Sequence, residues 1–118
     1  MSDHDDILEA EKALTDALKR MQNELHSASV ARQIVELAGE RRKNALSRLV
    51  VEHLNQDRSA AESEHRARSD ARYRTELQAI GAQTASALEV IGQYDLARHQ
   101  YEAARSILAV RRAEIGIL

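Results

Sequence analysis

The sequence predicts an all-α fold, a long antiparallel helical hairpin of the coiled-coil type. The 118 residues include no proline, the strongest helix breaker, and only four glycines. Helix-forming residues such as alanine, leucine, glutamate and arginine dominate, and no β-hairpin turn signal occurs. Two stripes of apolar residues recur at a spacing of seven, which is typical of helices that pack side by side.

The first stripe predicts a helical arm over about residues 5–54. Its members, at seven-residue spacing, are Ile7, Leu14, Met21, Ala28 and Val35. Leu18 and Leu25 lie four residues after two of them and widen the stripe on the same side of the helix. We therefore expect one continuous apolar face along this arm.

A turn is predicted over about residues 55–59, where the polar run Asn-Gln-Asp-Arg-Ser interrupts the apolar pattern. Ser59 and Glu62 form a capping-box pattern, in which the hydroxyl and the carboxylate satisfy free amides at a helix start. The alternative is a chance Ser-x-x-Glu inside one longer helix. The pattern favours a second arm that begins near residue 60.

The second stripe predicts that this arm extends over about residues 60–115. Its members are Tyr73, Ile80, Ala87, Tyr94, Tyr101, Leu108 and Ile115. The repeat continues in phase through Gly81 and Gly92, so we expect both glycines inside the helix at about 1 kcal/mol each relative to alanine. Residues 62–76 carry mixed charge without bulky apolar side chains, which predicts an end that projects into solvent.

A fold-back centred at position 57.5 brings together residues whose numbers sum to 115. Ile7 then faces Leu108, and Leu14 faces Tyr101. Acidic residues also come near arginines, namely Asp16 near Arg98 and Glu9 near Arg105. The stripes match equally well at any sum that differs by seven, so the position of the turn alone selects this register.

The rival architecture is a three-helix bundle broken near Gly39 and Gly81, which divide the chain into almost equal thirds. Gly39 follows the apolar pair Leu37-Ala38, as a glycine after a helix end does, and a polar run follows it. The middle third is poor in large apolar residues beyond Leu54. That composition favours the hairpin, and the bundle remains the alternative.

Several apolar residues lie off the two stripes, where a lone hairpin leaves them in water. They are Val30, Leu88, Leu96, Ile107, Val110 and Ile117. A second hairpin would cover them, so the sequence predicts a twofold dimer that forms a four-helix bundle. We take Leu96, Ile107 and Val110 as the candidate self-association residues.

Composition and motifs argue against several functions. The chain has no cysteine, no glycine-rich phosphate loop and no nucleophile elbow, so we expect a non-enzymatic cytoplasmic protein without cofactor or membrane span. Glu62 and His65 have the spacing of a di-iron ligand pair, but the second pair that such a site needs is missing. A terminal Ser2-Asp3-His4 resembles a copper-binding terminus, yet such triplets are common by chance. We predict no functional metal site.

Two basic groups are the candidate contacts to a partner or an anion. Arg41, Arg42 and Lys43 form one group, and Arg98 and Arg105 lie beside the tyrosine stripe. The formal net charge of −2 disfavours nucleic acid as the default partner. The sequence therefore favours a helical protein that self-associates and binds a protein as adaptor, chaperone or inhibitor. The alternative is a nucleic-acid accessory protein that uses these arginine-rich faces.

Overall fold

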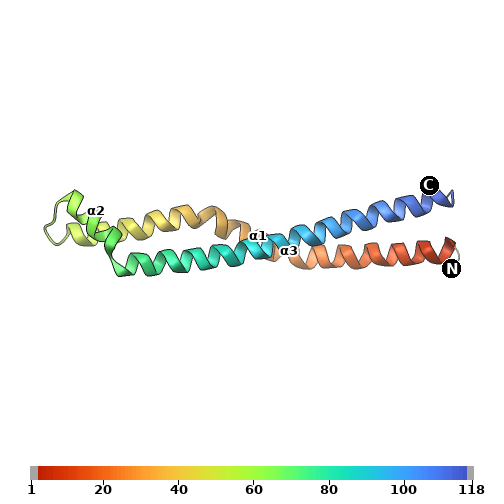
Figure 1. The fold of residues 1–118 in the computed structure, drawn as a ribbon, viewed down its shortest axis with the longest axis horizontal. Coiled ribbons are helices and arrows are strands. Elements are labelled where there is room, and N and C mark those ends of the chain that lie inside the picture. Colours follow the sequence, from red (N-terminus) through yellow and green to blue (C-terminus); the bar gives the residue numbers. More distant parts are fainter. Residues whose placement is uncertain (1–2, 117–118) are drawn as a thin grey trace. The chain divides into compact units, whose positions relative to one another are not determined.

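The computed structural model describes residues 3–116 as three helices, and no strand occurs among them. Helix α1 spans Asp3–Leu54, α2 spans Ala60–Ser69, and α3 spans Ala71–Glu114 (Figure 1). The predicted all-α fold is confirmed, with α1 and α3 as the antiparallel arms of a helical hairpin.

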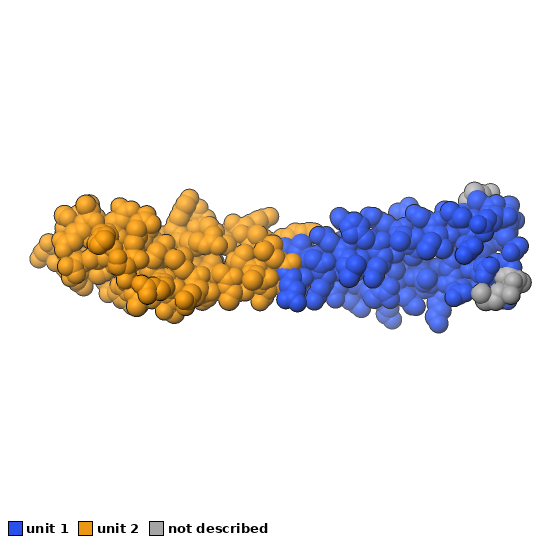
Figure 2. Space-filling view, viewed as in Figure 1, with its two compact units in different colours: residues 1–30, 89–118 blue, residues 31–88 orange. Residues whose placement is uncertain are grey.

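The chain divides into two compact units, each with its own stretch of both arms (Figure 2). Unit 1 contains residues 1–30 and 89–118, and unit 2 contains residues 31–88. In unit 1 the first turns of α1 lie beside the last turns of α3 (Figure 1). Unit 2 contains α2 in addition to the two arms.

Neither long arm breaks at a glycine. Gly39 lies inside α1, and Gly81 and Gly92 lie inside α3. A Cβ added at any of the three would meet no side chain within 4 Å, so no close contact requires glycine there. Both helices continue through these glycines, so the breaks that the three-helix alternative needs are absent.

The end of α1 at Leu54 and the start of α2 at Ala60 agree with the turn predicted over residues 55–59. Asp57 has a φ of 61°, a left-handed conformation that reverses the chain and that aspartate adopts more readily than most residues. Ser59 caps α2, because its Oγ accepts the Glu62 backbone N–H at 3.1 Å. The Glu62 carboxylate does not complete the box in the described structure. It accepts a hydrogen bond from Arg66 instead.

The second arm is not one helix from residue 60 onward, since an extended residue, Asp70, separates α2 from α3. Asp70 has φ −69° and ψ 132°, and its carboxylate accepts the Arg72 backbone N–H at 2.9 Å, as a cap at a helix start does. Helix α2 also does not simply project into solvent. Its Ser63 and Ala67 are fully buried, because small side chains allow α2 to pack closely on the rest of unit 2.

Nine of the thirteen buried apolar residues of the described part of the chain are alanines, and larger apolar side chains such as Leu14 and Ile115 are half-buried beside them. The buried alanines of the described residues are Ala10, Ala17, Ala28, Ala31, Ala38, Ala45, Ala67, Ala87 and Ala97. In unit 1, Ile7, Ala10 and Leu108 form a buried cluster, and Leu14 and Ile115 pack against it. Small side chains allow a close approach of helices but remove little apolar area from water per residue.

The register of the arms differs from the predicted one. Polar contacts between the arms join Glu11 with Arg112, Arg41 with Gln83, Arg48 with Glu76, and Glu52 with Arg72. The residue numbers of these pairs sum to 123 or 124, and the nearest sum that matches the stripes is 122. At that sum Ile115 faces Ile7, which agrees with its packing against the Ile7 cluster. The predicted sum of 115 is therefore about one heptad too low, because α2 moves the fold-back toward the C-terminus.

Candidate functional site

The three predicted self-association residues are exposed on α3 of unit 1. Leu96, Ile107 and Val110 expose 59%, 54% and 56% of their surface. Eleven residues separate Leu96 from Ile107, which is about three helical turns, so the two lie on nearly the same face. A depression of 270 Å³ next to this face is lined by Ser106, Ile107, Val110 and Arg111.

Large apolar side chains are exposed in both units while the seam buries small ones. The exposed large residues are Leu8, Leu25, Val30, Leu37, Val51, Leu54, Leu88, Leu96, Ile107 and Val110. Among the apolar residues predicted to lie off the two stripes, Val30 and Leu88 are exposed as well, and Ile117 lies outside the described residues. Scattered surface leucines are ordinary, but a chain that buries mainly alanine leaves much of its apolar area in water.

The first basic group lies on α1 of unit 2, with Arg41, Arg42 and Lys43 all exposed. Arg41 donates a hydrogen bond to the Gln83 side chain, and Lys43 lies 3.9 Å from the Glu40 carboxylate. A shallow depression of 530 Å³ beside Arg41 also contains Arg48. The Glu76 carboxylate forms a salt bridge with the Arg48 guanidinium and offsets its charge. Within the group, the Glu40 carboxylate offsets part of the charge of Lys43.

The second basic group makes its contacts along α3 itself. Arg98 lies 3.9 Å from Asp95, and the Arg105 guanidinium sits 5.9 Å from the centre of the Tyr101 ring. Asp16 and Glu9 would be the partners of these two arginines only in the predicted register, in which the numbers of facing residues sum to 115. In unit 1, Glu11 of α1 pairs with Arg112 of α3 at 3.4 Å.

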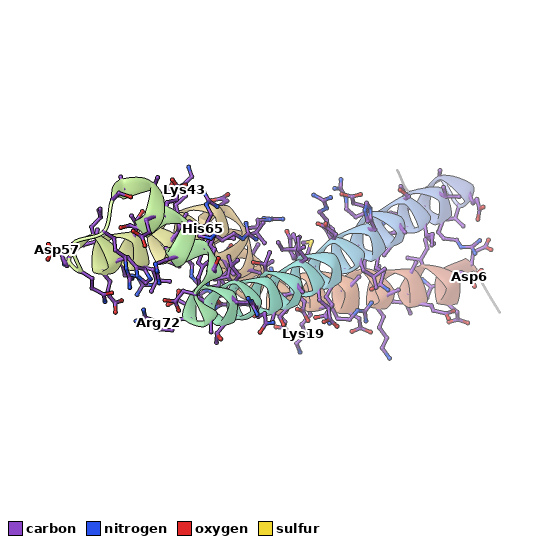
Figure 3. All side chains as sticks on the ribbon, turned by 60° about the vertical axis from the view of Figure 1, so that its left-hand side comes forward. Asp6, Lys19, Lys43, Asp57, His65 and Arg72 are labelled. Atoms are coloured by element: carbon purple, nitrogen blue, oxygen red, sulfur yellow. The ribbon has the colours of Figure 1, made fainter. Side chains whose placement is uncertain are left out.

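Side chains from α1, from the residues flanking α2 and from α3 meet at one corner of unit 2. His53, at the end of α1, has Nε2 3.5 Å from Asp70 Oδ2, and their side chains are only 12% and 14% exposed. Arg58 donates to His53 Nδ1. Arg72 bonds both Asp70 and Glu52, with N–O distances of 2.9 Å. Figure 3 shows Arg72 at the start of α3. The corner thereby fastens both ends of α2 to α1.

The charges at the corner reinforce one another. The side-chain hydrogen bond from Arg72, followed by the Arg72 backbone N–H, holds the pKa of Asp70 well below its usual range. In turn, the hydrogen bonds to Asp70 and then to Glu52 raise the pKa of Arg72 above its ordinary value. Asp70 is thus a stable carboxylate that holds the corner together, and it lacks the raised pKa of a general acid.

The corner was not predicted from the sequence, although one signal was available. Aspartate is among the preferred residues before a helix start, and Asp70 precedes the apolar stripe of α3. The contacts of Asp70 to His53 and Arg72 join three separate helices. No spacing rule along one helix can find such contacts.

We expect the Asp70 carboxylate to make the stability of the fold depend on pH. Its pKa is lower in the folded chain than the value of about 3.9 in an unfolded one. The carboxylate therefore stabilises the fold fully above about pH 4, and this contribution is lost as the pH falls through the folded pKa. Urea unfolding at about pH 7 and about pH 3 should show a smaller loss on acidification for Asp70→Asn than for the unmodified chain.

The matched control is Asp70→Asn in a chain that already carries Arg72→Gln. Because Arg72 is the main cause of the lowered Asp70 pKa, the same substitution should change the pH dependence much less in this background. An equal change in both backgrounds would contradict the role given to Arg72.

The described residues show neither a metal centre nor a membrane span. No group of three or more histidine, aspartate or glutamate side chains among residues 3–116 could hold a metal ion. Ser2 of the terminal triplet lies outside the described residues. No helix in the same part of the chain is long and apolar enough to cross a membrane.

Comparisons with protein-family models, curated proteins and solved structures found no match to this chain.

Proposed function

We propose that the chain is a non-enzymatic helical interaction protein that self-associates and presents a helical surface to a protein partner, as an adaptor, chaperone or inhibitor. The observation that carries this proposal is the exposure of large apolar side chains on both arms. Ten leucines, isoleucines and valines of the described residues are 41% to 59% exposed. Covering such residues is the usual driving force of association between helices.

The basic residues support a protein partner better than a nucleic acid. Arg48 and Arg112 pair with carboxylates across the hairpin, and Arg98 has one nearby on its own helix. An arginine already paired with a carboxylate releases fewer counterions from a phosphate backbone. Binding of single-stranded DNA that weakens steeply with added salt would overturn the proposal in favour of a nucleic-acid accessory role.

Light scattering tests the self-association. The unmodified chain should give a multiple of its 13.2 kDa mass. Replacing the three candidate residues together, Leu96→Ser, Ile107→Ser and Val110→Ser, should return the monomer mass, because it removes the large exposed apolar side chains of α3 in unit 1.

A matched control places three serines on exposed apolar residues of unit 2, with the substitutions Leu37→Ser, Val51→Ser and Leu54→Ser. This variant carries the same penalty in helix propensity but should keep the oligomer mass. Circular dichroism must show that both variants remain helical. A monomer mass for the unmodified chain at high micromolar concentration would refute self-association.

A further inference from the structure

The exposed apolar residues of α3 in unit 1 form a stripe that is centred on one alanine. Leu96, Ala103 and Val110 are spaced by seven residues, and Ile107 lies on the same face between the last two. All four are exposed in the hairpin. We name this set the α3 outer stripe. The equal spacing of Leu96 and Val110 on either side of Ala103 suits a partner whose identical helix runs the opposite way.

An antiparallel copy fits this stripe better than a parallel one. With a twofold axis at Ala103, Leu96 of each copy faces Val110 of the other, and the small alanines allow the two helices to approach closely at the axis. Antiparallel helices also have favourable dipoles.

The charges of unit 1 also select α3 over α1 as the helix that meets a copy. Residues 89–116 carry four acidic and four basic side chains, so this stretch has no net charge. Residues 3–30 carry seven acidic and three basic side chains. Two copies that met through α1 would bring two strongly acidic surfaces together, whereas two copies that meet through α3 bring together two neutral ones.

We infer that a second copy of this chain docks antiparallel on the α3 outer stripe, with the twofold axis at Ala103. This inference rests on the proposed self-association and adds the face, the direction and the register. The resulting interface is isologous, since the same stripe serves both copies.

Single cysteines in the full chain, which has none of its own, test the position of the axis. Ala103→Cys should yield at least about ten times more disulfide-linked dimer than the control, because a disulfide tolerates Cα separations of only about 4.4 to 6.8 Å. The control is Ala109→Cys, an equally exposed alanine of α3 that six residues turn about 120° away from the stripe.

The direction is tested with Leu96→Cys and Val110→Cys. In the antiparallel pair, position 96 of one copy lies about 21 Å from position 96 of the other, so neither variant should link to itself. An equimolar mixture of the two should give linked heterodimer. Self-linkage of both variants would show a parallel pair and overturn the inference.

Light scattering on the same samples separates the two proposals. A dimer mass without linkage at position 103 would overturn the docking face while leaving self-association intact. A monomer mass at high micromolar concentration would overturn both.

Discussion

Cysteines at positions 14 and 108 are expected to form a disulfide within one chain, because the numbers of facing residues on the two arms sum to about 122. Leu14 then faces Leu108, in agreement with the packing of Leu14 against the buried cluster that contains Leu108. The bond closes a loop of nearly 100 residues, which should stabilise the fold by about 4 to 5 kcal/mol. Comparing the oxidised and reduced forms of the same Leu14→Cys, Leu108→Cys variant removes the effect of the lost leucine packing.

The control pair is Leu14→Cys with Tyr101→Cys, which the register that sums to 115 would bring together. In the observed register these positions lie one heptad apart along the seam, about 10 Å, so the pair should stay reduced. Mass spectrometry of the denatured, unreduced protein tells a bond within one chain from a bond between two. Closure of the control pair alone would restore the lower register.

Replacing Ile80 by alanine should cost roughly 2 to 5 kcal/mol of unfolding free energy, because the loss of its side chain leaves a cavity in the seam. Ile80 is 2% exposed and is the largest fully buried apolar side chain of the described residues. Such a loss is a large fraction of the stability of a small domain.

The control for Ile80→Ala is Leu37→Ala, on α1 of the same unit. Leu37 is 55% exposed, so its truncation should change the free energy of unfolding by less than about 0.5 kcal/mol. Urea unfolding followed by circular dichroism measures both variants. Equal losses would mean that the alanine-rich seam does not stabilise unit 2.

The exposed α3 residues could be predicted because exposure on a helix follows from periodicity. Leu96, Ile107 and Val110 fall off the seven-residue stripe, and side chains off the stripe of a two-helix pair point to solvent. The partners of Arg98 and Arg105 could not be predicted in the same way. They depended on a register that the stripes leave undetermined by multiples of seven.

The two long helices, the turn after Leu54 and the cap at Ser59 follow from local sequence signals, because helix periodicity, the absence of proline and capping are local properties. The break at Asp70 and the register arise instead from packing between the helices. Asp70 leaves the helix where its carboxylate can bond Arg72 at the start of α3 and lie beside His53 of α1. Contacts between residues far apart in the chain are not encoded in any short spacing. They therefore emerge only when the three helices are packed together.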